Sequence, residues 1–375
     1  MKDNMTLKER IIAFCKKEVV FVIAVAVAIL SVFFVKPSAA YLSYPDYRVL
    51  ALLFCLMIIV AGIKEQGIFT LLGEKLTAKA KNSRQLSLLL VLLCFFCSML
   101  ITNDVALITF VPFALELLCL SGLQEKIIKV VVLQTIAANL GSMFTPIGNP
   151  QNLYLYGLTG MGLVEFLLYM LPLTVLSLLL LLVVIFTEKP LPVVTDLQEE
   201  EKHPDMRKVW TYIGLFLCCL LTVVHILPWQ ASFIMVFGVM LVIDKGLFAK
   251  VDYCLLGTFL GFFIFVGNMQ NIPAVSTWLQ SLLAGKEMLL SALASQVISN
   301  VPAAMLLSGF TEEYKALLYG VNIGGLGTLI ASLASIISYK FYAEMKDSRK
   351  GKYMMVFTAY NVVFFAILLA AGFML

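Results

Sequence analysis

Ile101-Thr102-Asn103-Asp104 interrupts a long apolar run of the sequence, and two further polar stretches interrupt the next one: Asn139-Leu140-Gly141-Ser142 and Thr145-Pro146-Ile147-Gly148-Asn149-Pro150-Gln151-Asn152. In a bilayer an unpaired backbone group is costly, so non-helical backbone persists only inside protein or beside a water-filled cavity. Helices that break near the membrane midplane are typical of the binding sites of secondary transporters. These stretches therefore predict a membrane protein organised around broken helices.

The composition places the whole chain in a membrane. Of its 375 residues, 61% are hydrophobic and 13% are charged, which is about half the charged fraction of a soluble domain. We expect an all-α polytopic membrane protein with about nine full spans of about 20 residues each. Its Lys and Arg residues cluster in short loops rather than on one face, so we expect membrane lipid and no nucleic acid as a partner.

The positive charges predict the orientation of the chain in the bacterial inner membrane. If the N-terminus is cytoplasmic, the inside segments hold 23 Lys and Arg residues: 1–18, 64–85, 121–130, 188–208, 244–252 and 340–352. Only Lys36, Arg48, Lys286 and Lys315 then lie outside. This asymmetry predicts a cytoplasmic N-terminus and an external C-terminus.

The predicted orientation leaves too little chain for two spans around residue 300. Residues 288–298 form an apolar run of 11 residues, or about 16 Å of helix, whereas the hydrocarbon core is about 30 Å thick. We therefore expect a re-entrant helical hairpin with Ser299-Asn300-Val301-Pro302 at its tip. The run 86–120 is predicted to be a second hairpin with its tip at Thr102-Asn103-Asp104, and two full spans are the alternative.

The two halves of the chain carry matching motifs in the same order. Ile101-Thr102-Asn103 corresponds to Ile298-Ser299-Asn300, and Asn139-Leu140-Gly141-Ser142 corresponds to Asn322-Ile323-Gly324-Gly325. Each half also contains an amphipathic piece expected at the interface, at 68–81 and 272–284. Because the two hairpins enter from opposite sides, the pattern predicts an inverted-topology repeat with two interrupted transmembrane helices.

This repeat defines four segments of the chain. We expect a cytoplasmic N-terminus at 1–18, a first membrane repeat at 19–187, a cytoplasmic linker at 188–208 and a second membrane repeat at 209–375. The linker contains the run Glu199-Glu200-Glu201-Lys202 and is interpreted as a solvated connector.

The candidate site residues lie at the predicted helix breaks. Helix N-termini suit an anion, and amide, hydroxyl and carbonyl oxygens suit a hard cation. The predicted solute-binding residues are Thr102, Asn103, Gly148, Asn149, Ser299, Asn300, Asn322 and Gly324. The predicted ion-coupling residues are Asp104, Thr145, Asn139 and Thr328, and a sodium ion is expected at Asn103, Asp104, Gly148 and Asn300. Simple capping of helix ends is the alternative for the Asn and Thr residues.

Asp104 is the most informative single residue, because a carboxylate within the membrane usually marks an ion pathway. The alternative is that it only caps the helix that follows. We see no Lys or Arg at the predicted midplane, so an anionic solute would depend on helix ends, amides and a bound cation. Cys94 and Cys97 form a CxxC without a second pair, which favours packing over metal binding, and no cofactor is expected beyond sodium or a proton.

The hairpin at Asn103-Asp104, together with the Gly148-Asn149-Pro150-Gln151-Asn152 stretch, resembles the ion transporter superfamily. Within it, nearly the whole chain is most similar to citrate-transporter-like and arsenite-permease-like anion permeases. The resemblance implies a scaffold and a transport domain that move by an elevator mechanism in a homodimer. It also implies that the hairpin tips bind sodium and the solute. Asp104 and Val301 depart from the Ser-Asn-Thr motif of the dicarboxylate branch.

The sequence therefore predicts a secondary active transporter of a small anionic solute, either a carboxylate or an inorganic oxyanion, that is coupled to sodium or a proton as in symport. A sodium/proton-type antiporter of the same fold is the first alternative, and a channel is the second. The sequence does not indicate an enzyme, because it contains no HExxH motif, Ser/His pair or acidic cluster, and no GxxxxGK[ST] motif for ATP.

Overall fold

The computed structural model describes residues 9, 14–15, 18–78, 80–193 and 204–375. The acidic run of the linker and most of the predicted N-terminal segment 1–18 lie outside these residues. The elements of the first half are α2 (Val19–Val32), η1 (Ala39–Ser43), α3 (Tyr47–Glu65), α4 (Ile68–Thr77), α5 (Ser83–Ile101), α6 (Asn103–Leu120), η2 (Gln124–Lys126), α7 (Ile127–Ser142), α8 (Pro150–Thr159) and α9 (Leu163–Phe186). Those of the second half are α10 (Met206–Val223), α11 (Trp229–Ile243), η3 (Lys245–Lys250), α12 (Tyr253–Gln270), α13 (Pro273–Leu283), α14 (Glu287–Ile298), α15 (Asn300–Ser308), α16 (Tyr314–Ile323), α17 (Leu333–Ala343) and α18 (Lys350–Gly372).

Seven of the described helices are long and apolar enough to cross a membrane: α3, α5, α6, α9, α10, α12 and α18. The prediction of an all-α polytopic membrane protein is confirmed. The predicted set of full spans differed, because it included the two interrupted helices, whose segments are short, and it placed α5 and α6 in a hairpin. It also included α2 and α11, which have only 14 and 15 described helical residues. Such helices extend about 21–23 Å, less than the hydrocarbon thickness of about 30 Å.

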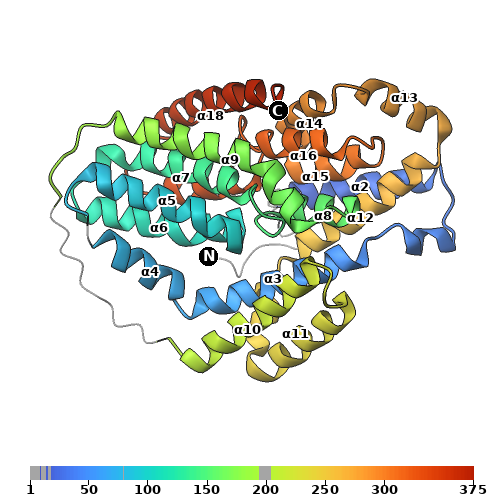
Figure 1. Cartoon of the computed structure of the whole chain (residues 1–375), viewed down its shortest axis with the longest axis horizontal. Helices are drawn as coiled ribbons and strands as arrows, with labels where there is room; N and C mark the ends of the chain where they lie inside the picture. Colours follow the sequence, from blue (N-terminus) through green and yellow to red (C-terminus); the bar gives the residue numbers. More distant parts are fainter. Residues whose placement is uncertain (1–8, 10–13, 16–17, 79, 194–203) are drawn as a thin grey trace.

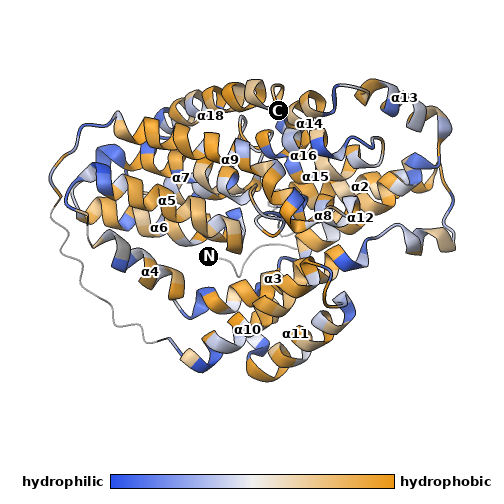
Figure 2. Ribbon diagram, viewed as in Figure 1, coloured by the Kyte–Doolittle hydropathy of each residue, from blue (hydrophilic) through white to orange (hydrophobic). Residues whose placement is uncertain are grey.

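The outer surface of the helices is apolar, as Figure 2 shows for α9 and α18. On α9 the exposed residues include Leu168, Leu179 and Val183. Its buried face instead includes Thr174 and Ser177, whose hydroxyls donate to backbone carbonyls one turn earlier at 2.8 and 2.6 Å. Apolar side chains outside and self-satisfied hydroxyls inside are the distribution expected of a lipid-facing helix.

The helices form two packed groups joined by crossing segments (Figure 1). Helices α5, α6, α7 and α9 pack together with α18, and helices α14, α15 and α16 pack together beside α12 and α2. Helix α3 packs against α10, α11 and η3. Helix α8 of the first half packs on α15 and α16, whereas α17 of the second half packs on α6 and α7. Each half therefore contributes helices to the group formed mainly by the other: α2 and α8 join the second group, and α17 and α18 join the first.

Both predicted hairpin tips have the same uncommon backbone conformation. Among the described residues, the only non-glycine residues with positive φ are Thr102, His225 and Ser299. Thr102 has φ 70° and ψ 150°, and Ser299 has φ 73° and ψ 155°. Such a conformation is costly for a residue with a side chain, and it persists only where the surrounding structure holds it. Two residues aligned from sequence alone thus share one strained geometry.

The lengths of the helices beside these tips differ between the halves. Helices α5 and α6 have 19 and 18 residues, and each is long enough to cross a membrane. Helices α14 and α15 have 12 and 9 residues, or about 18 and 14 Å, too short to do so. The amphipathic pieces predicted at 68–81 and 272–284 contain α4 and α13.

Candidate functional site

The two predicted interrupted helices do break. Helix α7 ends at Ser142 and α8 begins at Pro150, and helix α16 ends at Ile323 while α17 begins at Leu333. The segments 143–149 and 324–332 between them are named here the first and second break segments. Residues 146–156 are all buried, which excludes the view of this stretch as a loop on the outer surface of the protein.

Each predicted tip is connected to a break segment by an equivalent hydrogen bond. The backbone N–H of Asn103 donates to the carbonyl oxygen of Gly148 at 3.1 Å, and that of Asn300 donates to the carbonyl oxygen of Ala331 at 2.9 Å. Each donor is the first residue of a helix, where N–H groups have no partner within the helix. The two tips thus match in conformation and in the kind of partner that holds them.

Asn139 connects the first tip to the second break segment. Its Oδ1 accepts hydrogen bonds from Nδ2 of Asn103 at 3.0 Å and from Oγ of Ser332 at 2.9 Å. Its Nδ2 donates to the carbonyl oxygen of Gly325 at 3.4 Å. Asn139 is only 4% exposed, so each lost partner would leave a buried polar group unsatisfied, which is costly.

A second asparagine group connects the first break segment to α16. Nδ2 of Asn149 donates to Oδ1 of Asn322 at 3.2 Å, and Nδ2 of Asn322 donates to Oδ1 of Asn152 at 2.7 Å. Oδ1 of Asn149 also accepts from the backbone N–H of Asn152 at 2.9 Å and caps α8. Capping and joining of the two halves are therefore performed by the same side chain. We call the two groups together the asparagine network: Asn103, Asn139, Asn149, Asn152, Asn322 and Ser332.

Close packing at the first break segment requires glycine. A Cβ atom on Gly148 would lie 2.1 Å from the carbonyl oxygen of Ser142, a distance that no side chain tolerates. Nδ2 of Asn152 donates to the carbonyl oxygens of Met143 and Thr145 at 3.0 and 3.2 Å. The backbone of this break is thus satisfied by a side chain rather than by helix hydrogen bonds, as a buried break requires.

In the second break segment the side chain of Gln296 forms the hydrogen bonds to the backbone. This residue was not among those predicted from the sequence. Its Nε2 donates to the carbonyl oxygens of Gly324 and Leu326 at 3.0 and 2.9 Å. Its Oε1 accepts from the backbone N–H of Thr328 at 2.9 Å. The available signal was a glutamine in an apolar helix three residues before Ser299, the first residue of the predicted tip. Ser332 was also missed, because its partner Asn139 lies in the other half of the chain.

Two of the predicted ion-coupling residues have side chains that form hydrogen bonds outside the asparagine network. The hydroxyl of Thr145 donates to the carbonyl oxygen of Met99. Thr328 is exposed, and its hydroxyl donates to the carbonyl oxygen of Gln296 at 2.9 Å. Gly324 packs closely on α14, because a Cβ atom there would lie 2.7 Å from the Ser295 side chain.

A cavity of about 420 Å³ adjoins the network on the side of the first tip. Thr102, Asp104 and Asn149 line it, together with apolar residues of α3, α6 and α8. Its charged lining residues are Asp104 and, from α3, η3 and the start of α12, Lys64, Glu65, Lys250 and Asp252. The predicted site residues of the second half, Ser299, Asn300, Asn322 and Gly324, do not line this cavity.

The Asp104 side chain faces this cavity rather than capping α6. Asp104 is half-buried, and its backbone N–H donates to Oδ1 of Asn103 at 3.0 Å. The first turn of α6 is thus capped in part by Asn103, whereas the side chain of its N-cap residue Thr102 accepts no hydrogen bond from that turn. The carboxylate is therefore open to a ligand or ion in the cavity.

Oxygen atoms suited to a hard cation cluster around the first tip. The Gly148 carbonyl oxygen and Oδ1 of Asn103 each accept one hydrogen bond, and a carbonyl oxygen has two lone pairs. Over the part of the chain that the structure describes, no group of three or more His, Cys, Asp or Glu side chains is placed to hold a metal ion. The donor set fits sodium better than a transition metal.

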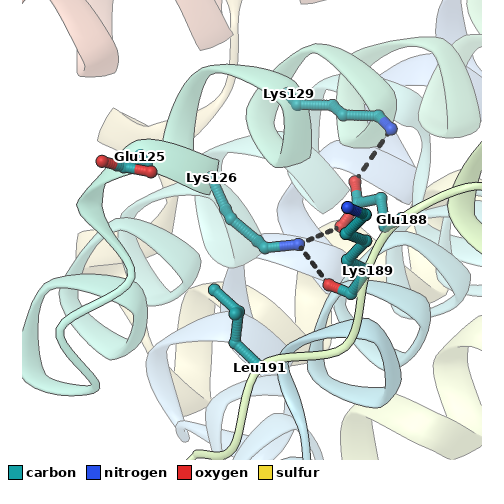
Figure 3. Close-up of a pocket in the computed structure, with 6 residues that line it drawn as sticks. All are labelled: Glu125, Lys126, Lys129, Glu188, Lys189 and Leu191. Carbon is teal, nitrogen blue, oxygen red and sulfur yellow. Dashed lines mark hydrogen bonds and ion pairs between the residues drawn. The ribbon is translucent and has the colours of Figure 1, made fainter.

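A second, smaller pocket of about 270 Å³ lies at the start of the linker (Figure 3). The Glu188 carboxylate forms ion pairs with Nζ of Lys126 and Lys129 at 2.7 and 3.0 Å. The Glu188 carbonyl oxygen accepts from Nε of Arg84 at 2.9 Å, and the backbone N–H of Ser83 donates to the carbonyl oxygen of Leu191 at 2.8 Å. These contacts connect the chain after α9 to the first residues of α5 and α7, and the two lysines neutralise the Glu188 carboxylate.

Comparison with known proteins agrees with this architecture. Residues 11–313 match the family model described as citrate transporter. The chain is 32% identical over 316 residues to the transporter MJ0456 of Methanocaldococcus jannaschii, covering 83% of this chain and 85% of that protein. It is 32% identical over 301 residues to the inner membrane protein YbiR of Escherichia coli, covering 79% and 80%. A shorter match, 34% identical over 127 residues, covers 34% of this chain and 26% of the silicon efflux transporter LSI3 of Oryza sativa. The chain therefore belongs to the citrate transporter family of membrane transporters, which confirms the resemblance seen in its sequence.

Proposed function

We propose that this membrane transporter is a secondary active transporter of a small anionic solute, a carboxylate or an inorganic oxyanion, coupled to sodium or a proton. The observation that carries the proposal is the pairing of the two tips. Thr102 and Ser299 have one strained conformation, and the helix that follows each begins with an asparagine bonded to a break segment. Two helix N-termini held in this way bring the positive ends of two helix dipoles to the break segments, and such ends attract an anion.

The matching tips also support an inverted-topology repeat of 19–187 and 209–375. In this proposal α14 and α15 form a re-entrant hairpin, since neither is long enough to cross a membrane, and α5 and α6 form its counterpart. The crossing of α8 and α17 between the two helix groups is what a pseudo-two-fold relation would produce. The excess of Lys and Arg on one side supports a cytoplasmic N-terminus and an external C-terminus in the inner membrane.

The proposal assigns separate roles around the tips. Asn103, Asn149, Asn300 and Asn322 hold the solute together with Thr102, Ser299, Gly148 and Gly324. Asp104 carries the coupling, with a sodium ion placed by oxygens of Asn103, Asp104, Gly148 and Asn300. Asn139 supports both roles because its side chain bonds both halves, and Thr145 and Thr328 act only through the backbone that they fix. A homodimer, as the family resemblance implies, would keep the scaffold domains fixed while the transport domain, to which both halves contribute, moves.

A sodium/proton-type antiporter is the second candidate. Two observations favour it over a channel: the Asp104 carboxylate faces a cavity, and one partial relative is a transporter described as acting in efflux. An exchanged cation would then bind at Asp104 without an anionic solute.

The test uses purified protein in liposomes with imposed sodium, proton and voltage gradients. Citrate, succinate, sulfate, phosphate and arsenite are offered in turn as labelled solutes. Saturable uptake of one anion that follows the sodium or proton gradient is the expected result. Sodium/proton exchange without any of these solutes would support the antiporter instead, and ohmic current would overturn both.

A further inference from the structure

Lys64 is the charged residue of the cavity that the proposed function leaves without a role. It lies in the last turn of α3, lines the same cavity as Thr102, Asp104 and Asn149, and is half-buried. The pattern of positive charges predicted that Lys64 lies in a cytoplasmic loop beyond the end of a span. In the structure it lines the cavity.

Three of the other four charged residues that line the cavity have partners of their own, and the fourth, Asp104, forms no ion pair with Lys64 within the described residues. Glu65 forms an ion pair with Lys250, with Oε1 and Nζ 3.3 Å apart. The Asp252 carboxylate accepts the backbone N–H of Leu255 at 2.9 Å and caps α12, where the helix dipole also stabilises its negative charge. Within the described residues, Lys64 takes part in none of the ion pairs. Its ammonium group is thus left to face the cavity.

An ammonium group that has lost part of its water and has no carboxylate partner is stabilised by an anion in reach. Snorkelling to the membrane surface is the ordinary alternative for a lysine at a helix end, but a snorkelling side chain would not line a cavity shared with a helix break. Thr102 and Asn149 line the same cavity, and their hydroxyl and amide groups can donate hydrogen bonds to an anion bound there.

We propose that Lys64 is a specificity-determining residue of the transporter and that its ammonium group binds the negatively charged group of the solute in this cavity, together with Thr102 and Asn149. The inference rests on the proposed function, and it names the solute class as one with a fixed negative charge. Lys64 belongs to α3, whereas Thr102 belongs to the tip before α6. The bound anion therefore bridges two helix groups that pack separately.

The experiment measures the dissociation constant and KM of the wild-type protein and three variants, using citrate, succinate, sulfate, phosphate and arsenite as probes. The variants are Lys64→Gln, Lys64→Arg and the matched control Lys245→Gln, an exposed lysine of η3 that does not line the cavity. For the anion that the wild type transports, Lys64→Gln should weaken binding by about tenfold or more, as expected for loss of one charge-assisted hydrogen bond. Lys64→Arg should keep most of the affinity, and Lys245→Gln should match the wild type. If Lys64 binds the solute, Lys64→Gln should raise KM and leave kcat nearly unchanged. If Lys64 has only a structural role, the substitution should instead lower the amount of active protein and leave KM unchanged.

The outcomes separate this inference from the proposed function. If the wild type transports an anion and Lys64→Gln transports it with unchanged KM, the role of Lys64 is wrong while the proposed function stands. If the wild type transports only a neutral solute or a cation, both are wrong. Size-exclusion profiles and melting temperatures of the variants identify a folding defect, and Lys64→Arg, which keeps the charge, then decides the outcome.

Discussion

Replacement of Asn139 by alanine tests the asparagine network in the most direct way. The change removes an acceptor for Asn103 and Ser332 and a donor to the Gly325 carbonyl oxygen. Hydrogen bonds between helices in a membrane contribute about 0.6 kcal/mol on average and up to about 1.7 kcal/mol. The loss of three such bonds at a fully enclosed residue should therefore lower the free energy of unfolding by about 2–5 kcal/mol.

The matched comparison is Ser332→Ala, which removes only the bond to Asn139 and should cost about 0.6–1.7 kcal/mol. Because Ser332 has lost its partner once Asn139 is alanine, the double variant should be nearly as stable as Asn139→Ala alone. Reversible unfolding of the purified protein in mixed micelles measures the three values. Equal stability of Asn139→Ala and the wild type, or strictly additive effects in the double variant, would show that these side chains do not bond across the two halves.

Three further changes test other parts of the account. Asp104→Asn should abolish or uncouple transport while expression stays normal, because the carboxylate is replaced by an amide of the same size; coupled uptake equal to that of the wild type would refute the coupling role. Gly148→Ala should reduce the yield of folded protein, because its Cβ would meet a carbonyl oxygen at 2.1 Å, whereas Gly162→Ala, with nothing within 4 Å, should be neutral; equal yields would contradict the packing. Glu188→Gln should lower the free energy of unfolding by about 1–3 kcal/mol, because two ammonium groups lose a buried charged acceptor; an unchanged melting temperature would show that this ion-paired cluster is not formed in solution.

The sequence predicted the helix breaks well, because polar residues and prolines inside apolar runs have few structural explanations. Helices α5 and α14 end at Ile101 and Ile298, directly before the predicted tips. Membrane membership and the interrupted helices followed from the same local signals. The shared backbone conformation of Thr102 and Ser299 was not foreseen, but the alignment of the two motifs had already paired these residues.

The hydrogen-bond partners of the polar side chains could not be predicted from the sequence. Gln296 and Ser332 bond to segments that lie far away along the chain, and no local pattern names such partners. Lys64 was placed outside the membrane by counting residues, whereas the packing of α3 brings it to a cavity. The hydroxyls of Thr145 and Thr328, which were predicted to take part in ion coupling, donate to the carbonyl oxygens of Met99 and Gln296, and the sequence did not indicate these partners. Position along a helix is readable from sequence, but the direction of a side chain at a break depends on the fold.

The central claim is that the solute binds between the two helix breaks. The most direct measurement is a structure determined by electron cryo-microscopy with a saturating concentration of the anion that the wild-type protein transports. The account predicts density for the anion at the N-terminus of α6, within reach of Thr102 and Asn149, that extends to the N-terminus of α15 at Asn300. Density at a site that touches only one of these helices, or neither, would contradict it.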